Sequence, residues 1–252
     1  MTDQRPLAEY VLRLGDSALI LGHQLSQWVG HSPAIEEELA IANVALDLIG
    51  QSRLWLMLAG EVEGKGRDED ALAYLRDAGG FRNLLLVEQP NGNFAQTIAR
   101  QFFFDAWHRL LLGELCESGD PRVADIAQKA LKEVEYHLRR SRDWVIALGD
   151  GTSESHARIQ ESIDDLWMYT GEMFDSDASD AALIGQGIAI DHAALLEPWI
   201  EYTGSVLREA TLNMPKGGFM QRGGRRGIHT EHLGYLLAEM QFLQRAYPNS
   251  TW

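Results

Sequence analysis

Apolar residues recur every three or four positions along most of this chain, and this spacing is the feature that most restricts its fold. In residues 7–29 the apolar positions are Leu7, Val11, Leu14, Ala18, Leu21, Leu25 and Trp28. Such spacing places the side chains on one face of an α-helix. No stretch of useful length alternates apolar and polar residues, as a half-buried strand would. The sequence therefore predicts an all-α protein.

Capping residues, prolines and glycines predict where the helices begin and end. Ser32-Pro33 has the pattern of an N-cap followed by proline, so a helix is expected from about 34 to 59, with its end at Gly60. Asn93 and Asp120 are expected to cap two later helices, the second ending near Gly149. Further helices are expected over 152–173, 191–212 and 229–246, with a polar loop over 63–70 and a glycine-rich loop over 214–227. Helices of this number and length favour a helical bundle with additional helices.

The chain has 252 residues, of which 45% are hydrophobic, and can therefore bury a full core. No segment resembles a linker between domains, and the glycine-rich loop leaves too little chain beyond it for a second domain. We therefore expect a single domain spanning 1–252.

The charge and the cysteine content exclude several classes of protein. With 22 Lys and Arg against 37 Asp and Glu, the formal net charge is −15, which would repel nucleic acid phosphates. The single cysteine, Cys116, excludes an intrachain disulfide and is expected to be a packed thiol. The first residues, MTDQRPLAEY, do not form a signal peptide, and no apolar run reaches about 18 residues. We expect a cytoplasmic protein that does not span a membrane.

The stretch KEVEYHLRRS, residues 132–141, outlines half of a metal site. His137 lies on the core-facing seam of the predicted helix, which runs through Val123, Ala127, Ala130, Val134, His137, Ser141, Trp144 and Leu148. A di-iron carboxylate site needs Glu-x-x-His on each of two helices and one carboxylate from each of two others. The residue three positions before His137 is Val134, which has no lone pair. Glu133 lies beside the seam. The pair is therefore broken at its glutamate.

A second copy of this pattern occurs earlier in the chain. Residues 47–53 can be laid on residues 133–139, so that acid matches acid, aliphatic matches aliphatic and arginine matches arginine. The ligand positions are then Leu48 and Gln51 in the first copy, and Val134 and His137 in the second. A bundle with pseudo-twofold symmetry would show this repetition.

Four long stretches carry a resemblance to a known family: LRLGDSALILGHQL, NLLLVEQPNGNFAQTIARQFFFDAWH, KEVEYHLRRSRDW and GIHTEHLGYLLAEMQFLQR. They resemble the C subunits of bacterial phenylacetyl-CoA epoxidases, over nearly the whole chain. The resemblance implies a ferritin-like helical fold and a relative of the catalytic A subunit that has lost its metal site. In this family the di-iron centre lies in the A subunit. The complex inserts one oxygen atom of O2 into the ring of phenylacetyl-CoA, forming an epoxide, with electrons from NADPH through other subunits.

The resemblance carries the ligand positions of the catalytic subunit onto five residues of this chain: Leu48, Gln51, Asp105, Val134 and His137. No residue matches the remaining carboxylate of the first helix, and the region near Gly22 and His23 is the nearest place. Only Asp105 and His137 could still act as ligands. The resemblance therefore implies no catalytic residue and no metal in this chain, with the iron in the partner subunit. It leaves the cofactor-binding residues undefined.

A buried polar network is the alternative to a metal at Asp105 and His137, because buried polar groups need hydrogen-bond partners. Asp47 could join this network, with Arg53 or Arg139 as its counter-ion. His229 and His232, at i and i+3, could bind an adventitious metal. They could equally open a helix, with Thr230 near its cap.

Two further groups favour contacts with a partner. Arg222, Arg225 and Arg226 form the densest basic stretch, which could meet an acidic partner or CoA phosphates, or could be a solvated loop. An aromatic set is expected to form core and, in part, a subunit interface: Phe102, Phe103, Phe104, Trp107, Trp28 and Trp55.

Three functions remain open. The first is a non-catalytic structural subunit of the epoxidase, which stabilises the catalytic A subunit, binds further subunits and self-associates when expressed alone. The second is an autonomous ferritin-like metalloenzyme with a non-standard metal site. The third is a free-standing helical scaffold. The missing glutamates separate the first from the second, and co-purification with a di-iron partner separates the first from the third.

Overall fold

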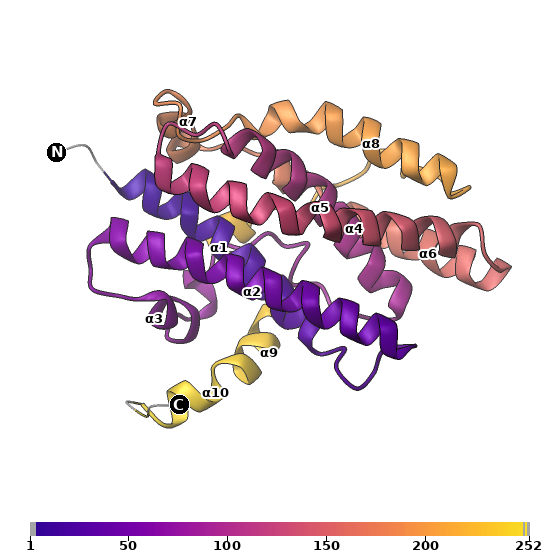
Figure 1. Ribbon diagram of the computed structural model, residues 1–252, viewed down its shortest axis with the longest axis horizontal. Coiled ribbons are helices and arrows are strands. Elements are labelled where there is room, and N and C mark those ends of the chain that lie inside the picture. Colours follow the sequence, from indigo (N-terminus) through magenta and orange to yellow (C-terminus); the bar gives the residue numbers. More distant parts are fainter. Residues whose placement is uncertain (1–3, 249, 251–252) are drawn as a thin grey trace. The chain divides into compact units, whose positions relative to one another are not determined.

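The computed structural model describes residues 4–248 and 250 (Figure 1). In this part of the chain all regular secondary structure is helical, so the predicted all-α class is confirmed. The α-helices are α1 Arg5–Ser26, α2 Ile35–Glu63, α3 Glu69–Tyr74, α4 Phe94–Leu115, α5 Pro121–Gly149, α6 Ser153–Trp167, α7 Ala178–Ile184, α8 Leu196–Glu209, α9 Glu231–Met240 and α10 Phe242–Ala246. Short 3-10 helices are η1 Ala78–Gly80, η2 Gly171–Phe174, η3 His192–Leu195 and η4 Gly224–Arg226. No helix among the described residues is long and apolar enough to cross a membrane.

The chain forms two compact units. The described residues of 1–90 and 222–252 form unit 1, and residues 91–221 form unit 2. Unit 1 thus combines α1, α2 and α3 with the C-terminal helices α9 and α10, whereas unit 2 is continuous and contains α4 to α8. The single domain spanning 1–252 stays a prediction.

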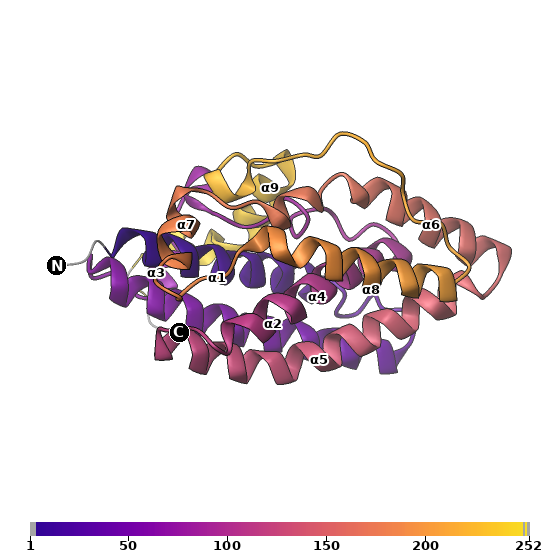
Figure 2. The ribbon, with the colours of Figure 1, turned by 90° about the horizontal axis from the view of Figure 1, so that it is seen from above.

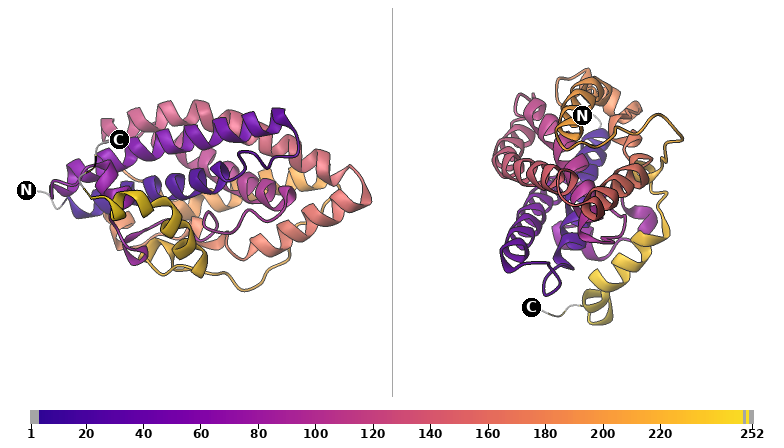
Figure 3. Two further views of the ribbon diagram at one scale, coloured as in Figure 1. Left: turned by 90° about the horizontal axis from the view of Figure 1, so that it is seen from below. Right: turned by 90° about the vertical axis from the view of Figure 1, so that its right-hand side faces the viewer.

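The pair of α1 and α2 is the largest helix contact of unit 1 (Figure 1). The two helices run antiparallel, and most of α1 is buried. The C-terminal helix α9 contacts both α1 and η1, as the yellow ribbon of Figure 3 shows. Residues from the two ends of the described chain therefore share one core.

Helix α2 differs from its predicted limits at both ends. Its N-cap is Ala34, and the hydroxyl of Ser32 instead donates to the carbonyl of Trp28 at 3.3 Å. The predicted Ser32 cap is therefore wrong. The predicted end at Gly60 is also wrong, because the helix continues to Glu63 and ends at Gly64, whose φ of 65° is left-handed. Gly60 is a packing residue, since a Cβ there would clash with the carbonyl oxygen of Arg67.

The predicted caps of two other helices are confirmed. The side chain of Asn93 accepts a hydrogen bond from the Gln96 amide at 3.1 Å, and Asp120 accepts one from the Arg122 amide at 3.0 Å. The remaining limits shift where short breaks replace continuous helix. The expected helix over 152–173 ends at Trp167, the one over 191–212 is η3 plus α8, and the one over 229–246 is α9 plus α10. Helix α3 begins at Glu69, inside the loop expected over 63–70.

Helix α4 is the centre of unit 2 and packs against α5, α6 and α8 (Figure 2). Its aromatic run Phe102, Phe103, Phe104 and Trp107 is at most 4% exposed. The Phe103 ring lies 5.6 Å from that of Trp199 in α8. The run is therefore core, as expected, and the place of part of the aromatic set at a subunit interface stays a prediction. Trp55 is likewise buried in unit 1, whereas Trp28 is half-buried.

Candidate functional site

Helix α5 turns His137 into the core of unit 2. The first six members of its predicted seam are buried, from Val123 to Ser141. Trp144 and Leu148 are only half-buried, and Val145 and Gly149 replace them on the buried face. This shift follows from the drift of a 3.6-residue helix against a strict seven-residue repeat. His137 is 1% exposed, so its predicted inward position is confirmed.

Asp105 of α4 joins His137 in a buried polar cluster. Its carboxylate is fully buried and accepts hydrogen bonds from Gln101 Nε2 at 2.6 Å and from Ser141 Oγ at 2.8 Å. Burial raises the pKa of Asp105 to about 6, against the opposing effects of the His137 charge and these hydrogen bonds. The cluster thus has the composition of the predicted polar network, with one ring, one carboxylate and two hydrogen-bond donors.

His137 and Arg140 are the cations that act on Asp105 in this cluster. Arg53 donates to Glu69 Oε1 at 3.1 Å in unit 1, and the Arg139 guanidinium lies over the ring of Tyr136 at 5.8 Å. Asp47 is a half-buried residue of α2, in unit 1, and its pairing with Arg53 or Arg139 stays a prediction.

His108 is a member of the cluster that sequence reasoning missed. It follows Asp105 by three residues on α4, is 4% exposed and lies beside the ring of Phe104 at 4.9 Å. In the described part of the chain its Nδ1 has no hydrogen-bond partner. Burial lowers the pKa of His108 to about 3, and the His137 charge adds to this effect. The acid-x-x-His spacing of Asp105 and His108 was the available signal, because residues at i and i+3 share a helix face.

The other carried-over positions lie in unit 1, between α1 and α2. Leu48 is fully buried, and Gln51 is 2% exposed. Gly22 of α1 faces them: a Cβ on it would lie 3.4 Å from Leu48 Cβ and 3.2 Å from the carbonyl oxygen of Ala45. A carboxylate side chain on Gly22 has no room here. Its neighbour His23 is half-buried, and burial lowers the pKa of His23.

These donors do not fit a di-iron centre, which takes four carboxylates and two histidines. Leu48 and Val134 offer only carbon, and both oxygens of Asp105 already accept hydrogen bonds. Within the described residues no three His, Cys, Asp or Glu side chains gather so that they could hold a metal ion.

His229 is committed to a different buried pair, in unit 1. Its Nδ1 lies 2.8 Å from Glu88 Oε2 and its Nε2 lies 3.0 Å from the carbonyl oxygen of Phe81. Two oxygen acceptors require both ring nitrogens to donate, so the ring is an imidazolium. Burial opposes this charge, but the hydrogen bond and charge of Glu88 outweigh burial and raise the pKa of His229. The ring therefore has no lone pair for a metal to share with His232.

Thr230 is the N-cap of α9, as predicted, but its side chain does not cap the helix. Its amide and hydroxyl both donate to Glu88 Oε1, at 2.6 and 2.8 Å. Glu88 thereby anchors the start of α9 to the loop that follows η1.

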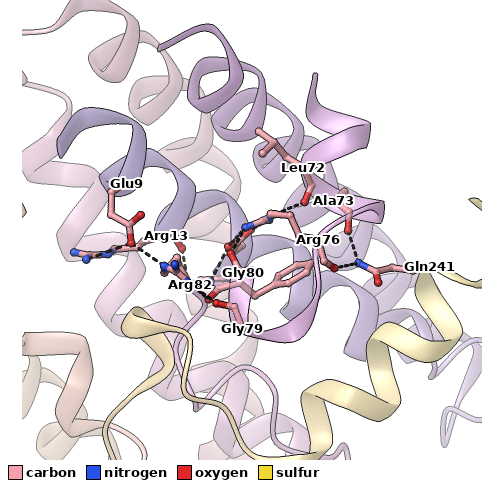
Figure 4. Close-up of polar contacts among 12 residues, drawn as sticks. Glu9, Arg13, Leu72, Ala73, Arg76, Gly79, Gly80, Arg82 and Gln241 are labelled. Carbon is pink, nitrogen blue, oxygen red and sulfur yellow. Dashed lines mark hydrogen bonds and ion pairs between the residues drawn. The ribbon is translucent and has the colours of Figure 1, made fainter. Parts of the chain in front are cut away.

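A cavity of about 710 Å³ in unit 1 lies between the start of α1, the end of α2 and the segment from Arg76 to Arg82. Its arginines face carboxylates. Arg76 donates to Asp16 at 2.9 Å, and Arg82 donates to Glu9 at 2.9 Å. Figure 4 shows Arg76 beside Gln241, whose Nε2 donates to the carbonyls of Ala73 and Arg76 at 3.0 Å each. The cavity wall is thus a network of paired charges that also holds the C-terminal helices.

The remaining predicted residues lie nearer the surface. Arg222 and Arg226 are exposed and Arg225 is half-buried, all in or beside η4 of unit 1. Their contact with an acidic partner or with CoA stays a prediction. Cys116 is half-buried, and burial raises the pKa of its thiol.

Comparison with known proteins identifies the family of this chain. Residues 1–252 match the family model described as phenylacetic acid catabolic protein. The chain is 52% identical over 246 residues to the C subunit of 1,2-phenylacetyl-CoA epoxidase from Escherichia coli (strain K12), covering 98% of this chain and 99% of that protein. The chain therefore belongs to the phenylacetic acid catabolic protein family, a family of ferritin-like helical proteins.

Proposed function

We propose that this chain is a non-catalytic structural subunit of a multicomponent phenylacetyl-CoA ring epoxidase, in aerobic phenylacetate degradation. The observation that carries the proposal is the end-to-end identity of 52% with a protein named as the C subunit of such an epoxidase. At this identity and coverage, the helices and their packing are shared along the whole chain. We place the protein in the cytoplasm, with its complex.

The residues at the ligand-equivalent positions support a non-catalytic role. Leu48 and Val134 stand where a di-iron site requires carboxylates. Gln101 and Ser141 hold Asp105 in a buried cluster with His137, and such a cluster orders the core when its hydrogen bonds are made. The chain contributes a rigid helical framework to the complex, and no cofactor.

The partner in this proposal is the di-iron catalytic A subunit, together with further subunits of the complex. Because both chains descend from one ferritin-like framework, the structural subunit presents a matching helical surface. It stabilises the catalytic subunit by mass action, since a partner that binds only the folded state raises its stability.

The experiment is elemental analysis of iron in this chain expressed alone and co-expressed with the A subunit, followed by an assay of ring epoxidation. We expect no iron in the lone chain, about two iron atoms per A subunit in the complex, and epoxide from the complex only. The Val134→Leu variant, which also lacks a donor, is the matched control and should leave the iron content of the complex unchanged. Stoichiometric iron in the lone chain would overturn the proposal and favour an autonomous metalloenzyme.

A further inference from the structure

Helix α2 of unit 1 is apolar on two faces. One face, with Leu48 and Trp55, is buried. The opposite face exposes four large apolar side chains: Ile35 is 71% exposed, Leu39 62%, Leu46 65% and Met57 45%. A row of apolar side chains in water on one helix is typical of an interaction surface. We call this row, together with the exposed Arg53, the α2 stripe.

The spacing of the residues in the α2 stripe is the same from either end of the helix. Its members 35, 39, 46, 53 and 57 are separated by steps of four, seven, seven and four residues. At about 100° per residue they all lie within about 20° of the direction of Leu46, and they span about 33 Å. Leu46 is therefore the midpoint of a symmetric row.

Such symmetry is what a twofold axis requires of a helix that pairs with itself, since each position must face its mirror position on the other copy. We propose that the α2 stripe is the interface of a homodimer, in which α2 pairs antiparallel with α2 of a second copy around an axis at Leu46. Ile35 then faces Met57, Leu39 faces Arg53, and Leu46 faces its own counterpart. The inference concerns the chain alone and does not depend on the proposed function.

The small residues beside the stripe support the same axis. Gly50 is exposed in the middle of α2, and a Cβ on it would meet no atom within 4 Å. Such a glycine weakens a helix relative to alanine, and no contact within the chain accounts for it. Ala42 and Gly50 stand four residues on either side of Leu46, so antiparallel pairing places them against each other. Two small residues there let the backbones approach closely on both sides of the axis.

Charge also favours the antiparallel direction. The first turn of α2 carries Glu36, Glu37 and Glu38. A parallel pair would bring these two acidic turns together, whereas an antiparallel pair keeps them about 27 Å apart along the helix axis. It also brings the exposed Glu36 within one turn of Arg53 of the second copy, whose side chain is 68% exposed. Because each copy has a net charge of −15, the dimer should tighten as salt rises.

Disulfide trapping tests the geometry, in the full chain with Cys116→Ser so that no other thiol reacts. Leu46→Cys should cross-link to a second copy under mild oxidation, because an axial pair falls within the Cα separation that a disulfide needs. Ile35→Cys and Met57→Cys should cross-link when mixed, and far less when each is oxidised alone. Leu196→Cys, on an exposed leucine of α8 in unit 2, is the matched control and should stay monomeric. Efficient cross-linking of Ile35→Cys alone would overturn the antiparallel pairing.

Sedimentation equilibrium of the chain without additions tests the interface itself. We expect a dimer, and Leu46→Glu should raise the dissociation constant at least ~100-fold, because it places two carboxylates on the axis. Leu196→Glu should leave the constant unchanged. A wild-type chain that is monomeric at about 100 µM, where a Kd in the micromolar range would give dimer, would overturn the proposal. So would a Leu46→Glu variant that dimerises normally. If the wild type is monomeric while Leu46→Glu blocks binding of the catalytic subunit, the stripe belongs to that partner and the self-pairing is wrong.

Discussion

The two long helix pairs, α1 with α2 in unit 1 and α4 with α5 in unit 2, differ in how their ligand-equivalent positions are filled. Between α1 and α2 the positions hold the fully buried Leu48 and the buried amide Gln51, opposite Gly22, where a Cβ would lie 3.4 Å from Leu48 Cβ. Between α4 and α5 they hold Asp105, Val134 and His137, with Ser141 bonded to Asp105. The α1 and α2 pair is closed without an ionisable group, and the α4 and α5 pair keeps a hydrogen-bonded cluster with a carboxylate and a histidine.

The comparison shows that equivalent positions can be filled in two ways within one fold. Apolar closure removes the cost of burying polar groups, and well-packed apolar replacements of buried charges are often neutral or stabilising. A retained cluster must instead keep every buried polar atom satisfied. The α4 and α5 pair is therefore the more sensitive to pH, and the α1 and α2 pair is the more sensitive to added volume.

The largest expected effect comes from adding volume to the closed pair. Gly22→Leu should lower the free energy of unfolding by about 3 kcal/mol or more, because overpacking forces the helices apart. The first atom of the new side chain would already lie 3.0 Å from Ile49 Cγ1. Urea denaturation followed by circular dichroism measures the change. Gly113→Leu in α4, where a Cβ meets no atom within 4 Å, is the control and should not destabilise. Equal stability of the two variants would show that the pair is not tightly closed.

A smaller loss is expected from opening the polar cluster. His137→Ala should cost about 2 kcal/mol, since it removes a buried ring and a charge that favours the ionised Asp105. Denaturation at pH 7.5 measures the loss, and elemental analysis should find the metal content of the chain unchanged. Glu135→Ala, on the exposed face of α5, should alter stability by less than about 0.5 kcal/mol. A His137→Ala protein that unfolds like the wild type would mean that the cluster contributes nothing.

The smallest expected effect is the pH dependence of stability that His108 gives to the α4 and α5 pair. His108 has a pKa of about 3 in the folded chain, against 6.5 as its ordinary value. The unfolded chain thus binds the proton more tightly, and stability should fall as pH drops below 6.5. At pH 5.5 this protonation should lower the free energy of unfolding by about 1 kcal/mol, and His108→Phe should abolish that loss.

Asp105 acts in the opposite direction, because its folded pKa of about 6 exceeds the ordinary 3.8. Its contribution to stability is full below pH 3.8 and is lost as pH rises through 6. The comparison for His108 should therefore be made in an Asp105→Asn background, by denaturation at pH 5.5 and 7.5. Identical pH slopes with and without His108 would contradict its burial in the neutral form.

The features that sequence predicts well are the local ones. The caps at Asn93 and Asp120 depend on a side chain reaching an amide two or three residues away, so their signal lies in a few adjacent letters. A glycine such as Gly60 predicts the end of a helix. Here the glycine lies within the helix, and the close approach of the Arg67 backbone, a tertiary contact, explains why a residue without a side chain stands there. No local pattern distinguishes these two uses of glycine.

In the candidate site, too, the local features could be predicted from the sequence and the tertiary contacts could not. The inward position of His137 follows from the seam spacing, and the acid-x-x-His spacing on α4 was readable although it was missed. That Gly22 closes against Leu48 depends on how two helices meet, which the spacing along either helix does not contain. The resemblance indicated that a ligand position lies near Gly22, and the close packing of α1 against α2 explains why that position holds no carboxylate.

Unit 1 is built from both ends of the described chain, and this has a consequence for synthesis on the ribosome. Its hydrogen bonds from His229 and Thr230 to Glu88, and from Gln241 to the α3 segment, join residues more than a hundred positions apart. Since a chain emerges from its N-terminus, α1 and α2 can pair early, but the contact of α1 with α9 must wait until the whole of unit 2 has been translated. The continuous unit 2 can form its core during that delay. The apolar face of α1 that α9 later covers stays exposed during that delay and is a candidate for chaperone binding.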